Sequence, residues 1–146
     1  MIVQTIQLSL APVFVLVAIG NILNILSTRL GRVVDRARTL QDLHNRTEGG
    51  EHDMVVLEIR VVDERIKIIT QAIRLMVLSG LAIGTTVAVL FVQGIFGADL
   101  HVFAAITFLA SVLFLLAALV LFLRETRIAA ESLRIPRDYL ELHRKI

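Results

Sequence analysis

The chain has 146 residues, 56% of them hydrophobic, and its mean hydropathy is +0.78. This apolar share exceeds the roughly 45–50% of soluble domains. The net charge of +2 arises from 15 basic and 13 acidic residues in mixed segments, which excludes the one-sign basic arm typical of nucleic-acid binding. The absence of cysteine excludes disulfides, zinc–thiolate sites and thiol nucleophiles.

Charge is almost absent from three long stretches, and this pattern predicts a membrane protein. All Lys and Arg residues lie within residues 29–74 or after Leu123. A helix needs roughly 20 apolar residues to cross a bilayer core. We therefore predict one all-α membrane domain over residues 1–146, with three transmembrane helices at about residues 7–28, 75–97 and 100–123. Because basic residues near span ends stay cytoplasmic, the N-terminus should lie outside and the C-terminus in the cytoplasm.

The first span contains Pro12 and should continue beyond Thr28 as one long helix that ends near His44. Apolar residues recur along it at alternating spacings of four and three, which is the seam pattern of a coiled coil. A glycine-containing turn follows at residues 45–51, and Asp53 is placed to cap the next helix. A second apolar stripe then runs into the second span, so residues 29–74 should form a cytoplasmic antiparallel helical hairpin. The two stripes consist of Ile19, Leu23, Leu26, Leu30, Val33, Ala37, Leu40 and His44, and of Val55, Ile59, Val62, Ile66, Ile69, Ile73 and Met76.

The second and third spans should form a transmembrane hairpin around a tight outer turn at residues 93–99. The second span contains a GxxxG motif at Gly80 and Gly84, which allows close helix packing. The cytoplasmic helix or tail at residues 124–146 should continue the third helix to about Ile135. Pro136 then breaks it or begins a short final helix, and the apolar residues among its charges suit the inner membrane surface.

One face of the first helix carries polar residues at spacings of three and four. Asn21 and Asn24 lie well inside the apolar stretch, where polar groups need partners or water. In one interpretation their amides hydrogen-bond across helices and hold subunits together. In another, several copies of this helix surround a water-filled path that conducts ions, and a third is a small-ligand site. The face consists of Asn21, Asn24, Thr28, Gly31, Asp35, Arg38 and Asp42.

A basic collar follows the first span at the expected inner membrane surface. It comprises Arg29, Arg32, Arg36 and Arg38, with Asp35 among them. Positive-inside anchoring and lipid headgroup contact explain such a collar. An anionic-lipid or anion site is the functional alternative, and the Asp35–Arg38 spacing also suits ordinary pairing on a helix.

Residue patterns that would indicate catalysis, a metal or a cofactor are missing. The four histidines show no ligand spacing, and a solvated turn explains Glu51-His52-Asp53 better than a metal or pH-sensing cluster. There is no glycine-rich phosphate loop, nucleophile elbow or pair of acids within a span. We therefore expect no catalytic residue, no metal ligand and no cofactor, and we predict that the protein is not an enzyme.

The segments Ile19–Asn24 and Thr28–Leu40 together resemble the signature of a known family. It is an uncharacterised family of small three-span bacterial inner-membrane proteins, described as a domain of unknown function. The resemblance is densest between Ile19 and Leu40, and the three-span layout extends it over most of the chain. It implies a bacterial inner-membrane location, but no reaction, substrate, cofactor or functional residue.

Two functional hypotheses follow. The first is a homo-oligomeric, channel-like assembly in the lipid bilayer, in which Asn21, Asn24 and Thr28 line the axis and Asp35 and Arg32 lie near the cytoplasmic mouth. The second is a structural or accessory membrane protein whose cytoplasmic hairpin docks an unknown protein partner without transport. The first predicts ion flux, and the second predicts a dry axis and a co-purifying partner. Neither hypothesis involves nucleic acid.

Overall fold

Three long helices contain most of the residues that the structure describes. The computed structural model describes residues 2–132, in which α1 spans Ile2–His44, α2 spans Gly50–Phe96 and α3 spans His101–Ser132. No strand occurs within residues 2–132, and the predicted all-α class is confirmed. Each helix is long and apolar enough to cross a membrane, so the chain is a multi-pass membrane protein.

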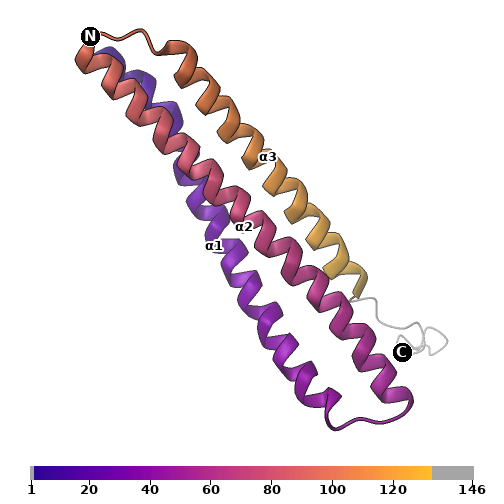
Figure 1. Cartoon of the computed structure of the whole chain (residues 1–146). Helices are drawn as coiled ribbons and strands as arrows, with labels where there is room; N and C mark the ends of the chain where they lie inside the picture. Colours follow the sequence, from indigo (N-terminus) through magenta and orange to yellow (C-terminus); the bar gives the residue numbers. More distant parts are fainter. Residues whose placement is uncertain (1, 133–146) are drawn as a thin grey trace, which may run out of the picture.

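The helices lie side by side, with α2 between α1 and α3 (Figure 1). Short connections at residues 45–49 and 97–100 join them, so neighbouring helices are antiparallel. α1 and α3 scarcely touch each other. Near the α1–α2 turn, α1 and α2 continue beyond the described end of α3 (Figure 1). α2 therefore carries two separate interfaces, one for each neighbour.

The interface between α1 and α2 is built from large apolar side chains. Its buried residues recur every seventh position in both helices, and all lie on or continue the stripes described above. Burying one such stripe against another removes apolar surface from water wherever the helices are solvated. Its fully or nearly fully buried members are Ile19, Leu26, Val33 and Leu40 on α1 and Val62, Ile69, Met76 and Ile83 on α2. That residues 29–74 project into the cytoplasm stays a prediction.

The interface between α2 and α3 also repeats every seventh residue, but its side chains are small or polar. Small residues allow two helix backbones to approach closely in a membrane, and hydroxyl groups supply hydrogen bonds between them. This seam was not predicted, because α3 is apolar all round and its sequence shows no distinct stripe. The buried residues are Ala72, Ser79 and Thr86 on α2 and Ala104, Ser111, Ala118 and Glu125 on α3.

The helix ends agree with the prediction at His44 and Phe96 but differ at the start of α2. The prediction that Asp53 caps α2 is wrong, because α2 begins at Gly50 and its N-cap is Gly49, at φ 65°. Glycine reaches this left-handed backbone conformation without strain, so the helix starts one turn early. Asp53 lies in the first turn, where its carboxylate interacts favourably with the helix dipole.

The other end of α2 is closed by Gly97, also left-handed, whose N–H donates to the Gln93 carbonyl at 2.9 Å. α1 continues through Pro12 without interruption. The predictions for Ile135, Pro136 and the tail on the inner membrane surface lie outside the described residues.

Candidate functional site

The polar face of α1 points away from both neighbouring helices. Asn21, Asn24, Thr28 and Asp35 are all exposed, as are Gly31, Arg38 and Asp42. In the seven-residue repeat these positions lie opposite the buried residues Ile19, Leu26, Val33 and Leu40. The residues that the sequence groups on one face therefore share that face in the structure, and α2 and α3 leave it uncovered.

The two asparagine amides are without hydrogen-bond partners in the described part of the chain. Thr28 is already engaged, because its Oγ1 donates to the Asn24 carbonyl at 2.9 Å within α1. Thr39 bonds the Asp35 carbonyl at 3.1 Å in the same way. The free hydrogen-bonding capacity of this face within the predicted span thus resides in Asn21 and Asn24, each of which has two amide donors and one carbonyl acceptor.

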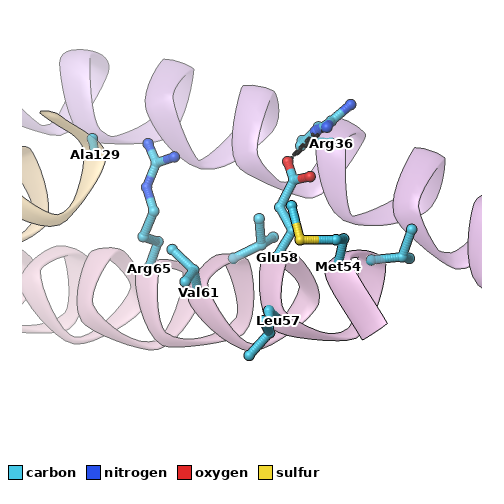
Figure 2. Close-up of a pocket in the computed structure, with 9 residues that line it drawn as sticks. Arg36, Met54, Leu57, Glu58, Val61, Arg65 and Ala129 are labelled. Atoms are coloured by element: carbon cyan, nitrogen blue, oxygen red, sulfur yellow. Dashed lines mark hydrogen bonds and ion pairs between the residues drawn. The ribbon is translucent and has the colours of Figure 1, made fainter. Parts of the chain in front are cut away.

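The four arginines of the predicted collar have different surroundings. Arg36 reaches across to Glu58 of α2, with its Nε 2.7 Å from the carboxylate (Figure 2). Arg38 forms only a loose, exposed pair with Asp35, 3.7 Å apart, and Arg32 is exposed. Arg32 and Arg38 therefore remain on the surface, whereas Arg29 and Arg36 bridge helices.

Arg29 belongs to an ion-pair cluster that joins all three helices. Its Nη1 lies 2.5 Å from a carboxylate oxygen of Glu125 on α3, and Arg65 of α2 binds the other oxygen through two nitrogens at 2.9 and 3.0 Å. Glu125 is fully buried, and the Arg29 guanidinium also stacks over the Phe122 ring at 4.9 Å. The cluster therefore links α1 and α3 through their side chains, although the two helices scarcely touch elsewhere.

Sequence reasoning missed this cluster, although two signals for it exist. Arg29 is the first charged residue after the first span, and Arg124 and Glu125 are the first after the third. The first and third helices therefore reach the edge of their apolar segments at about the same level. Glu125 also lies seven residues beyond Ala118, on the buried repeat of α3. A carboxylate at such a position needs a cationic partner.

Hydroxyl groups connect α2 and α3 inside the apolar segments. Ser79 and Ser111 are buried and donate to each other's carbonyl oxygens, at 2.8 and 3.0 Å. Thr86 and Thr107 meet at 2.8 Å. These polar groups are satisfied within the chain, unlike the asparagines of α1.

The two glycines of the GxxxG motif are not equivalent. A methyl group added at Gly80 would meet the Ile19 and Leu16 side chains of α1 at 3.9 and 4.0 Å. Gly84 is exposed, with nothing within 4 Å of such a group. Within one chain the motif thus faces α1 at Gly80 but not at Gly84, and it does not create a close backbone crossing.

Side chains suited to metal binding are scattered. No group of three or more His, Cys, Asp or Glu residues within residues 2–132 could hold a metal ion. His44 and His52 lie close together at the α1–α2 turn, with ring centroids 4.4 Å apart. Among the described residues, the polar groups best placed to bind a ligand or a second copy are the exposed amides of Asn21 and Asn24 and the exposed charges of Arg32 and Asp35 on α1.

Comparison with known families agrees with the resemblance in the sequence. Residues 9–135 match the family described as "Protein of unknown function (DUF2721)". No curated protein and no solved structure matches the chain. Since the match covers most of the sequence and parts of all three helices, the chain belongs to this family.

Proposed function

We propose that this member of the DUF2721 family forms a homo-oligomer in the bacterial inner membrane, with copies of α1 arranged around a common axis. Asn21, Asn24 and Thr28 line a path for ions along that axis. Asp35 and Arg32 lie at its cytoplasmic mouth. Rings of amides, hydroxyls and charges of this kind replace part of the hydration shell of an ion.

The uncovered polar face of α1 is the observation that carries this proposal. An unsatisfied polar group in hydrocarbon costs several kcal/mol, whereas a hydrogen bond between membrane helices contributes about 0.6–1.7 kcal/mol. A hydrogen bond between two asparagine amides thus adds little stability by itself, but an amide that faces lipid without any partner is strongly disfavoured. Asn21 and Asn24 therefore favour a position against other amides or water over a position in lipid.

A second copy of the chain is the simplest partner for this face. Small and polar residues suit close contact between membrane helices, and both Gly20 and Gly31 on α1 are open, with nothing within 4 Å of an added methyl group. α3 is a poorer candidate for the axis. Its hydroxyl groups at Thr107 and Ser111 are already bonded to α2.

The proposed orientation places the N-terminus outside and the α1–α2 turn inside. The connection between α2 and α3 carries no Lys or Arg, whereas residues 29–74 carry many. Short segments rich in Lys and Arg remain in the cytoplasm. With this orientation Asp35 and Arg32 lie just beyond the inner end of the first span.

Ion flux from vesicles tests the proposal. Purified protein is reconstituted into liposomes, and efflux of potassium, sodium and chloride is followed for the wild type, Asn21→Leu and Asn24→Leu. We expect flux in the wild type and a loss of most of it in both variants. Thr85→Val is the matched control, because Thr85 is exposed on α2 and its hydroxyl bonds only its own helix. Absence of flux, or flux unchanged by Asn21→Leu and Asn24→Leu, would rule out the pore.

The oligomer is tested separately from the pore. Because the chain has no cysteine, Asn24→Cys provides a single thiol on the proposed axis. Oxidation in the membrane should give a disulfide-linked dimer, whereas Thr85→Cys should not. A dimer formed equally by both variants would show that α1 does not define the contact.

An accessory role is the second candidate, and exposed apolar residues on the α1–α2 pair favour it. Met54 and Leu57 of α2 are 70% and 57% exposed, outside the predicted spans. A cytoplasmic protein partner could cover them, with Asn21 and Asn24 serving only assembly. This role predicts no flux and a stoichiometric partner that is lost on Leu57→Asp.

A further inference from the structure

Arg74 is an exposed cation on the side of α2 that neither neighbouring helix covers. It lies two residues from each of the buried residues Ala72 and Met76, which face α3 and α1. Two residues turn a helix by about 200°, so Arg74 lies on the side of α2 opposite to both neighbours. Among residues 2–132, no hydrogen bond or ion pair engages its guanidinium group. Arg74 therefore offers all its N–H donors to a partner outside the chain.

The register of α2 against α3 places Arg74 well inside the apolar part of the bundle. Arg65 and Glu125 pair where the apolar segment of α3 ends, and Ser79 and Ser111 pair deeper along the same two helices. Arg74 lies between these two contacts, nine residues beyond Arg65. Nine residues extend about 13 Å along a helix, whereas the whole hydrocarbon core is roughly 30 Å thick. The sequence alone places Arg74 at the edge of the second span, but the helix register places it deeper.

The other two helices expose apolar side chains at the levels between Arg65 and Arg74. Ile25 on α1 and Val120 on α3 are 50% and 65% exposed. On α2 the exposed residue in this interval next to Arg74 is Gln71, one turn away. The surface suited to hydrocarbon thus begins deeper on the side of α2 than on the sides of α1 and α3. A charged side chain that faces lipid without a partner is costly, and local thinning of the bilayer lowers that cost.

We infer that Arg74 and Gln71 bind the phosphate of a phospholipid from the leaflet on the side of the α1–α2 turn. The planar guanidinium matches two phosphate oxygens, and the amide of Gln71 adds further donors. The headgroup then lies deeper along α2 than the headgroups beside α3. The inference does not depend on the proposed pore.

A phosphate that carries acyl chains suits this position better than a free phosphate ion. Leu78 and Leu81 follow Arg74 by four and seven residues on the same side of α2, and they are 45% and 64% exposed. The acyl chains of a lipid bound at Arg74 would cover these leucines. Free phosphate would have to leave water for this depth without any such contact.

Lipid binding by the full-length protein in detergent tests the role of Arg74. The protein is titrated with phosphatidylglycerol, and the bound lipid is counted by native mass spectrometry. Arg74→Leu should weaken the affinity about tenfold, since it removes a charged hydrogen-bond donor. Arg60→Leu is the matched control, because Arg60 is exposed on the same side of α2 but lies 14 residues closer to the α1–α2 turn. It should change the affinity less than about twofold.

Two further ligands identify the group that is bound. Diacylglycerol with the same acyl chains should bind weakly, and equally to the wild type and Arg74→Leu. Inorganic phosphate at the concentration of the lipid should not displace phosphatidylglycerol. Unchanged lipid affinity in Arg74→Leu, equal binding of diacylglycerol and phosphatidylglycerol, or displacement by inorganic phosphate would each overturn the inference.

Spin labels in liposomes compare the two sides of the bundle at one level. Because the chain has no cysteine, Gln71→Cys and Val120→Cys provide single thiols, six residues from Arg65 and five from Glu125. A water-soluble nickel chelate should relax the label at position 71 several-fold more than the label at position 120. Adding Arg74→Leu should remove most of this difference, while circular dichroism confirms that the helices remain folded.

Two results of the spin-label experiment would contradict the inference. Equally low accessibility to the nickel chelate at both positions would show that no headgroup reaches Arg74. Protection of position 71 from both the nickel chelate and oxygen would show that a second copy of the chain, and not lipid, covers this side of α2.

Discussion

The two interfaces of α2 are built from different kinds of side chain. Toward α1 the repeat consists of large apolar residues such as Ile69 and Met76, whereas toward α3 it consists of alanine and hydroxyl residues such as Ala72 and Ser79. Lipid tails are as apolar as leucine, so large apolar side chains gain little from meeting each other inside a bilayer. Small and polar residues gain close packing and hydrogen bonds there. The α2–α3 interface is therefore suited to hydrocarbon, whereas large apolar residues such as those of the α1–α2 interface gain most where they are removed from water.

This contrast implies that α1 and α2 are held together mainly beyond the predicted spans. Val33, Leu40 and Val62 lie in the segment proposed to be cytoplasmic, where their burial removes apolar surface from water. Within the predicted spans α1 should therefore be held less firmly to α2. The polar face of α1 at Asn21 and Asn24, in the first of these spans, is not covered by α2 or α3.

The largest effect is expected at the cluster that joins both interfaces. Glu125→Ala removes a fully buried carboxylate and leaves Arg29 and Arg65 without their shared partner, which should lower the free energy of unfolding by about 3–5 kcal/mol. Denaturant titration of the protein in lipid-like detergent measures it. Glu64→Ala is the control, because its ion pair with Arg124 is half exposed and should contribute about 1 kcal/mol or less. Equal losses in the two variants would contradict a special role for the cluster.

A matched pair of leucines tests the difference between water and lipid directly. Leu40 and Leu26 belong to the same repeat, and both are fully buried. Leu40→Ala should cost about 2–3 kcal/mol, as in a solvated core. Leu26→Ala should cost less than about half of that, because an unpaired helix would still surround this leucine with lipid. Comparable losses in bilayer vesicles would show that the two positions share one environment.

The hydroxyl contact between α2 and α3 should contribute a smaller amount. A double-mutant cycle with Ser79→Ala and Ser111→Ala should give a coupling energy of about 0.6–1.7 kcal/mol. Thr85→Ala combined with Ser111→Ala should give none, because the Thr85 hydroxyl bonds Leu81 of its own helix. A coupling energy near zero for Ser79 and Ser111 would show that side-chain packing, and not this hydrogen bond, stabilises the α2–α3 interface.

The smallest effect is expected at the open glycine of the GxxxG motif. Gly84→Ala should stabilise one chain by up to about 1 kcal/mol, because alanine favours the helix and nothing lies within 4 Å of the added methyl group. Thermal unfolding at low protein concentration measures it. If Gly84→Ala instead destabilised the isolated chain, the added methyl group must meet another part of the chain, which would contradict the open position of Gly84.

Large apolar stripes made much of the fold predictable. The repeat from Ile19 to Leu40 predicted both the continuation of α1 and its end at His44, because a break would have interrupted the stripe. The same reasoning failed for the start of α2. Asp53 has the chemistry of a cap, but the left-handed Gly49 lets the helix begin earlier.

The α2–α3 interface and the Glu125 cluster were not predicted, for two physical reasons. α3 is apolar all round, so hydrophobic periodicity cannot distinguish the face of Ala104 and Ala118 from its lipid-facing sides. The partners of Glu125 lie far along the chain, on α1 and α2, and local spacing does not reveal them. The exposed face of Asn21 and Asn24 was predictable because its signal lies within one helix.

The position of the α1–α2 turn also has a consequence for the order in which the chain assembles. Contacts beside the turn, such as that of His44 with His52, join positions about 8 apart, and those at the far end of the pair join positions roughly 90 apart, which adds about 2 kcal/mol of loop-closure entropy. Pairing of α1 with α2 should therefore begin beside His44 and His52 and extend from there toward the N-terminal end of α1. The end of the helix pair beside the turn, proposed to lie in the cytoplasm, would pair first, and the part of α1 that contains Asn21 and Asn24 would pair with α2 later.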